Sequence, residues 1–86
     1  MAVIHKVQVN NTWCVEVPHD ALILKIDFQD MLPTVWYKTK NPNAAKSTIE
    51  IHMIGTGFEF EDVDMIYVNT VFQGPFVGHF FWKPLP

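Results

Sequence analysis

The chain has 86 residues, of which 49% are apolar and only 17% are charged, and its formal net charge is −3. All six basic residues are lysines, and the lack of arginine together with the acidic balance argues against duplex nucleic acid as the main partner. A single cysteine, Cys14, rules out an internal disulfide, and no run approaches the ~20 apolar residues of a membrane-spanning helix.

So short a chain buries only about 60–65% of its unfolded surface. We therefore expect one domain over residues 1–86, with copies associating as a homo-oligomer to shelter the surplus apolar side chains. The N-terminal residues alternate like a strand and lack the long apolar core of a signal peptide, so we expect a cytoplasmic protein with no membrane partner.

Apolar and polar residues alternate with period two in the first half of the chain, as they do in half-buried strands. The strands predicted in this way cover residues 3–9, 13–17, 22–28, 35–40 and 48–54. The turn Asn10-Asn11-Thr12 leads us to expect that the first two strands form a hairpin.

Two longer apolar runs, 65–72 and 76–82, are typical of strands that are buried on both faces. No segment has helical periodicity. Seven short strands at this spacing predict an all-β fold, a small antiparallel β-sandwich or barrel of about six to seven strands.

The order of several motifs resembles a family of small proteins of unknown function that are encoded by phages and prophages. The matching segments are Pro18-His19-Asp20-Ala21, Trp36, Pro42, Met53-Ile54-Gly55-Thr56-Gly57, Tyr67-Val68-Asn69-Thr70 and Gly74-Pro75-Phe76-Val77-Gly78-His79-Phe80-Phe81. The chain departs from the family pattern at Asn69, where glycine is commoner, and at Gly78, where an aromatic residue is commoner. The second departure leaves a gap in the last strand that another side chain must fill. The resemblance implies a phage origin and supplies no activity.

Trp36, Lys38 and Lys40 form the one neighbourhood that is both basic and aromatic. A base can stack on an indole while a lysine meets a phosphate, as in nucleotide and single-strand sites. Lysines that protect an edge strand from aggregation are an equally good interpretation.

The turn Gly55-Thr56-Gly57 can offer backbone N–H groups to a phosphate, although such loops normally open a helix and none follows. A tight turn that needs positive φ is the simpler interpretation. We add Thr70 and His79 to the ligand-binding candidates, with a core or interface histidine as the alternative for His79.

The last strand supplies the expected oligomer interface, because both of its faces are apolar. The candidate residues are Phe76, Phe80, Phe81 and Trp82.

No catalytic residue, metal ligand or cofactor is predicted, since paired carboxylates, a triad and metal-ligand spacing are all missing from the sequence. We expect a non-enzymatic phage-type binding protein, a counter-factor to host defence that sequesters a small anionic, nucleotide-like signal at an oligomer interface. Two alternatives stay open. One is an inhibitor that binds a host protein through the acidic segment 59–64 and the exposed Met31 and Leu32, and the other is a structural or accessory phage protein.

Overall fold

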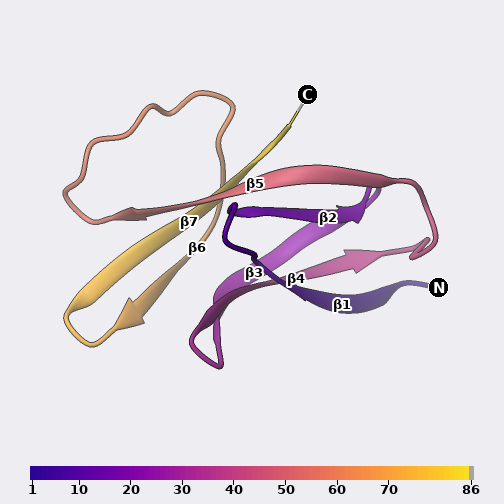
Figure 1. Cartoon of the computed structure of the whole chain (residues 1–86), viewed down its shortest axis with the longest axis horizontal. Helices are drawn as coiled ribbons and strands as arrows, with labels where there is room; N and C mark the ends of the chain where they lie inside the picture. The colour runs from indigo at the N-terminus through magenta and orange to yellow at the C-terminus, as the bar shows by residue number, and fades with distance from the viewer. Residues whose placement is uncertain (86) are drawn as a thin grey trace.

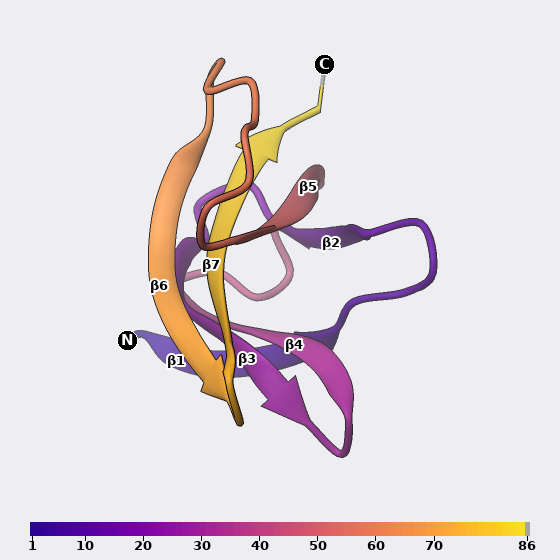
Figure 2. The ribbon, with the colours of Figure 1, turned by 90° about the vertical axis from the view of Figure 1, so that its left-hand side faces the viewer.

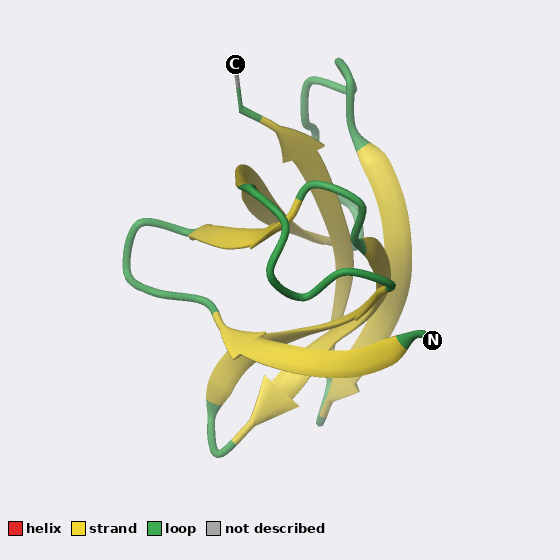
Figure 3. Ribbon diagram, turned by 90° about the vertical axis from the view of Figure 1, so that its right-hand side faces the viewer, coloured by secondary structure: helices red, strands yellow, loops and turns green. Residues whose placement is uncertain are grey.

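The computed structural model describes residues 1–85, and that part of the chain consists of strands and loops (Figures 1 and 3). Since those residues form no helix, none is present that could cross a membrane. The strands are β1 (Val3–Gln8), β2 (Cys14–Pro18), β3 (Leu22–Gln29), β4 (Leu32–Thr39), β5 (Lys46–Gly55), β6 (Ile66–Gln73) and β7 (Phe76–Pro84).

The strands form two antiparallel sheets that pack as a sandwich. One sheet has the order β1-β4-β3 and the other the order β2-β5-β7-β6. Figure 2 shows β6 and β7 side by side in the second sheet, with β3 and β4 in the first. The predicted all-β antiparallel fold is confirmed.

The predicted hairpin of the first two strands is wrong, because β1 pairs with β4 and β2 pairs with β5. Backbone pairing with β4 continues past β1, where the Val9 N–H donates to the Pro33 carbonyl at 2.8 Å. The chain then crosses to the other sheet, and Trp13 turns it with a φ of 60°. The Asn10 turn therefore links two layers of the sandwich instead of two neighbouring strands.

Two tight hairpins do form, each with a two-residue loop. Gln73 pairs with Phe76 across Gly74-Pro75, where Gly74 has a φ of 56°. Asp30 and Met31 join β3 to β4 with φ values of 52° and 68°, a combination that hairpins with right-handed twist favour but that normally selects glycine or asparagine.

The core lies between the sheets and is made of strand residues that face inward. Its fully buried members include Ile26, Val35 and Phe80. Phe80 packs against Phe28 at a ring-centroid distance of 5.9 Å. The space expected at Gly78 is filled by the side chains of Phe76 and Met53, since a Cβ there would come within 3.0 Å of Phe76 and within 3.2 Å of Met53.

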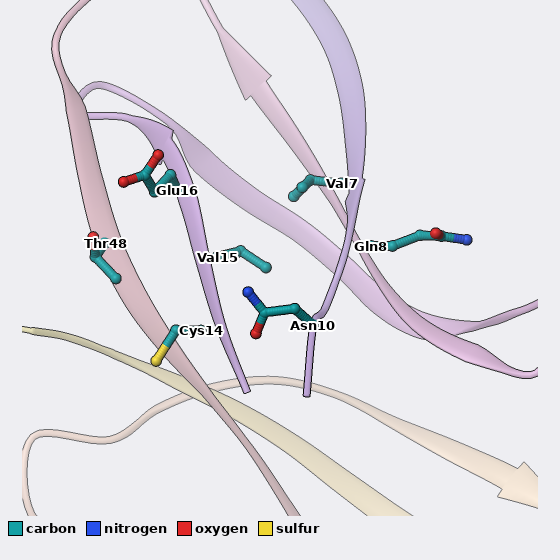
Figure 4. A pocket seen from close by; sticks show the side chains of 7 residues that line it. All are labelled: Val7, Gln8, Asn10, Cys14, Val15, Glu16 and Thr48. Carbon is teal, nitrogen blue, oxygen red and sulfur yellow. The ribbon is translucent and has the colours of Figure 1, made fainter. Parts of the chain in front are cut away.

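The two seams of the sandwich differ. Asn69 of β6 bonds to the backbone of β3 and joins the sheets along one side. Along the other side, β1 and β2 are both edge strands, and a groove of about 500 Å³ lies there. Figure 4 shows Val7, Val15 and Asn10 pointing into this groove, while Gln8 points away.

Candidate functional site

The outer surface of the three-stranded sheet holds the basic, aromatic neighbourhood. Trp36 lies between the buried residues Val35 and Tyr37 on β4, so its side chain projects to the opposite, outer face. The strand register sets Lys6 of β1 and Lys25 of β3 directly opposite Trp36, one on each side. Opposite residues of an antiparallel pair have Cβ atoms about 5 Å apart and share a face.

Lys38 is two residues further along β4 and exposed on the same face. We call Lys6, Lys25, Trp36 and Lys38 the Trp36 face. It gathers three of the six lysines around one half-buried indole. Sequence reasoning placed Trp36 and Lys38 together but missed Lys6 and Lys25, which only the cross-strand register reveals.

Two of these lysines already have weak polar partners. The Lys6 ammonium donates to the Gln29 side chain at 2.7 Å, and the Lys25 ammonium lies 3.5 Å from the Asp27 carboxylate. All four groups are solvent-exposed or nearly so, and such contacts contribute little to stability. An arriving anion can therefore replace them at low cost.

Lys40 lies outside this face, in the turn that follows β4. Its backbone N–H donates to Asp20 at 3.0 Å, and the Thr39 hydroxyl donates to the same carboxylate at 2.6 Å. The Thr39 hydrogen bond is the main cause that holds the pKa of Asp20 below its ordinary value. Through its backbone N–H, Lys40 thus helps to close the turn after β4.

The remaining predicted ligand residues gather on the other sheet, around His79. The Thr56 hydroxyl lies 2.7 Å from His79 Nε2, and the Thr70 hydroxyl lies 2.9 Å from His79 Nδ1. The Tyr67 hydroxyl is 2.7 Å from the Thr70 hydroxyl and extends the chain. Because a hydroxyl can both donate and accept, Thr56 and Thr70 together satisfy both ring nitrogens of His79.

Gly55, Thr56 and Gly57 form the tight turn that leaves β5. The Phe58 N–H donates to the Gly55 carbonyl at 3.1 Å, and Gly57 has a φ of 90°. The Thr56 N–H donates to the Val77 carbonyl, so this amide is not free for a phosphate.

The predicted ligand residues therefore form two groups on different sheets. Trp36 and Lys38 belong to β4, whereas Thr70 and His79 belong to β6 and β7. One copy of the chain does not bring them into a single site.

The predicted interface residues of β7 divide in a similar way. Phe80 has no exposed surface and belongs to the protomer's own core, and Trp82 packs partly against that core. Phe81 lies on the outer face and packs against Phe60 of the loop between β5 and β6, with ring centroids 5.3 Å apart. Only Phe76, at 39%, is exposed.

A carboxylate–histidine pair on β5 was also missed. Glu50 and His52 are two residues apart on one face, and the His52 Nε2–H donates to the Glu50 carboxylate. This bond is the main cause that lowers the pKa of Glu50, and the Lys83 ammonium at 3.6 Å adds to it. Period-two spacing in Glu50-Ile51-His52 could have shown the pairing. Among residues 1–85, no group of three metal-ligating side chains accompanies it.

The acidic segment lies in the long loop between β5 and β6, in which residues 57–64 are all exposed. Large apolar residues accompany the four acids there: Phe58 is 72% exposed and Val63 is 61% exposed. This loop thus presents both negative charge and apolar surface.

A family model described as Domain of unknown function (DUF7352) matches residues 1–86. No curated protein and no solved structure matches the chain.

Proposed function

The chain belongs to the DUF7352 family of unknown function, and we propose that it is a non-enzymatic binding protein that holds a small anionic, nucleotide-like ligand on the Trp36 face. The observation that carries this proposal is the cross-strand register, which flanks Trp36 with Lys6 and Lys25. An aromatic platform with cations on both sides matches a ligand that has a planar base and a phosphate.

The chemistry of the face favours a compact anion over a long duplex. Lysine binds phosphate as a point charge, without the fixed fork by which arginine reads guanine or follows a helical backbone. Three lysines on one face suit one or two phosphate groups, and the net charge of −3 disfavours extended nucleic acid.

The resemblance to small phage and prophage proteins supports a biological setting for such binding. In this proposal the protein acts stoichiometrically in the host cytoplasm. It removes a nucleotide-type defence signal from its receptor by stacking and charge neutralisation, with no bond made or broken.

Calorimetry with the purified protein tests this function. The probes are cyclic AMP, cyclic di-AMP, cyclic GMP–AMP and ADP-ribose, each titrated at low salt. We expect at least one to bind, and Trp36→Leu to weaken its affinity roughly 5- to 100-fold, the value of one base stack.

Trp13→Leu is the matched control, because Trp13 is 39% exposed but lies outside the three-stranded sheet. It should bind like the wild type. No heat with any probe would refute the proposal, and binding that survives Trp36→Leu but not Trp13→Leu would move the site to the other sheet.

A second candidate, an inhibitor of a host protein, is favoured by the loop between β5 and β6. Phe58 and Val63 stand exposed among four acids, a combination that suits a basic partner with an apolar pocket. Reversing Glu59 and Glu61 to lysine should abolish recovery of a specific host protein from lysate. A structural or accessory phage role predicts instead that the chain is found in purified particles.

A further inference from the structure

The four edge strands of the sandwich are not equally protected. Edge strands expose unpaired backbone groups, and proteins usually block them with a proline, a bulge or a covering side chain. Three of the edges here carry such a device. The strand β2 has five residues and ends at Pro18, whereas β3 and β6 each contain a register shift and are joined by Asn69.

The strand β1 has one lysine, Lys6, but no proline, bulge or covering side chain. All six of its residues, from Val3 to Gln8, pair with β4 in unbroken register, and it contains no proline. Five of the six are exposed, including Ile4 at 60% and Val3 at 36%. This regular edge can therefore accept another strand.

The backbone groups that face the free edge can be identified. Val9 donates its N–H to Pro33, so it belongs to a hydrogen-bonded pair of the β1–β4 ladder. Such pairs alternate with non-bonded ones. The N–H and C=O groups of Ile4, Lys6 and Gln8 therefore point away from β4.

We propose that β1 pairs antiparallel with β1 of a second copy, forming a two-fold dimer with His5 opposite His5 at its centre. In a continuous sheet, residues that lie opposite each other project to the same face, so the two-fold axis must set one residue of β1 opposite its own copy. The residues in the middle of β1 are His5 and Lys6. Centring on Lys6 would set two ammonium groups directly opposite each other, which is destabilising. Centring on His5 sets Ile4 opposite Lys6 of the second copy. This pair and its symmetry mate are both hydrogen-bonded pairs, because the N–H and C=O groups of Ile4 and Lys6 point to the free edge.

The groove at the open seam supports a second copy as the occupant. In this register Val3 of the second copy lies opposite Val7, and Val7 lines the groove of about 500 Å³ together with Val15 (Figure 4). Val3 of one copy thus meets Val7 at the edge of the other copy's groove, and the two-fold symmetry makes this contact reciprocal.

The dimer has a consequence for the Trp36 face. Ile4 and Lys6 lie on the outer surface beside Lys38 and Trp36 respectively. The pairing therefore joins the two outer surfaces into one six-stranded sheet and brings Lys6 of the second copy next to Ile4 and Lys38. The dimer itself does not depend on the proposed ligand, and its tests use the protein without one.

Single-cysteine cross-linking tests the register. In a Cys14→Ser background, His5→Cys should convert to a disulfide dimer under mild oxidation, because non-hydrogen-bonded opposite residues bring their Cβ atoms closest. Lys6→Cys should form no disulfide-linked dimer, because Lys6 lies opposite Ile4 of the second copy. Phe72→Cys, at a side chain that is 75% exposed on β6, measures cross-linking by random collision and should lag far behind. A disulfide-linked dimer from Lys6→Cys alone, or no excess of the disulfide-linked His5→Cys dimer over that of Phe72→Cys, would overturn the register.

Light scattering tests the dimer itself. The wild type should have twice the chain mass of 10.0 kDa. Ile4→Pro should halve that mass, since it removes an N–H at the free edge without breaking a bond to β4. Ile4→Val keeps the N–H and should remain dimeric, while circular dichroism checks that both variants fold. A wild-type mass of 10.0 kDa at all concentrations, or an Ile4→Pro dimer, would show that β1 is not the interface.

Discussion

The side-chain amide of Asn69 pairs with the backbone of Ile26 in the way that a neighbouring strand would. Its Oδ1 accepts the Ile26 N–H and its Nδ2 donates to the Ile26 carbonyl, both at 2.8 Å. The register shift between Tyr67 and Asn69 places this amide where β6 passes β3. One side chain thereby joins the two sheets.

Asn69→Ala should destabilise the protein by about 2–4 kcal/mol, because it leaves the N–H and the carbonyl of the fully buried Ile26 without partners. Urea denaturation measures the loss. Asn10→Ala, which removes two exposed local hydrogen bonds that Thr12 donates from its N–H and its hydroxyl, is the control and should change the free energy of unfolding by about 0.5 kcal/mol or less. Equal effects of the two variants would contradict the role of Asn69.

Met31→Gly should stabilise the protein. Met31 is 91% exposed and has a φ of 68°, a backbone conformation that costs a residue with a Cβ about 1–2 kcal/mol. Because its exposed side chain contributes little packing, we expect the substitution to raise the free energy of unfolding by about 1 kcal/mol. Asp30→Gly should gain less, since aspartate tolerates this region better. Thermal and urea unfolding compare the two variants, and a destabilised Met31→Gly would show that the side chain packs.

Phe80→Ala should unfold or severely destabilise the protomer, by about 3–5 kcal/mol, because Phe80 is fully buried in the core. An interface residue would instead change the mass and leave the fold intact. Phe72→Ala is the matched control, since the Phe72 side chain is 75% exposed. Circular dichroism and light scattering separate the two effects.

Asp20 should contribute an acid-sensitive part of the stability. Its pKa is lowered in the folded state, chiefly by the Thr39 hydroxyl, so the ionised form stabilises the fold above the unfolded pKa of 3.8. That contribution is lost as the pH falls through the lower, folded pKa. The stability difference between the wild type and Asp20→Asn should therefore be largest near neutral pH and shrink below pH 3.8. A stability difference that is independent of pH would contradict this role of Asp20. Asp62→Asn, in the exposed loop, is the control.

Lys25→Gln should weaken the proposed ligand about equally for probes with different bases, since it removes a phosphate contact and not the stacking platform. The dependence of affinity on salt should become shallower at the same time. Lys83→Gln, on the other sheet, is the control. Calorimetry at two salt concentrations measures both effects, and an unchanged salt dependence would place the phosphate elsewhere.

Much of the fold could be predicted from local pattern. Alternation located β1 to β5, and the apolar runs located β6 and β7, because the direction of a strand side chain depends only on its own backbone. The same local pattern predicted that Met31 and Leu32 are exposed at a turn, and both are.

Strand pairing could not be predicted in this way. A period of two tells which face a residue occupies but not which strand lies beside it, and pairing depends on contacts far apart in the sequence. For this reason the Asn10 turn predicts a hairpin that does not form, and the apolar last strand predicts an interface at Phe80, which lies in the core. For the same reason the sequence gives no sign that Lys6 and Lys25 lie beside Trp36. The amide of Asn69 gave no signal either, since its partner lies 43 residues away. Local chemistry thus specified the strands, whereas the packing of two sheets decided which of their side chains meet.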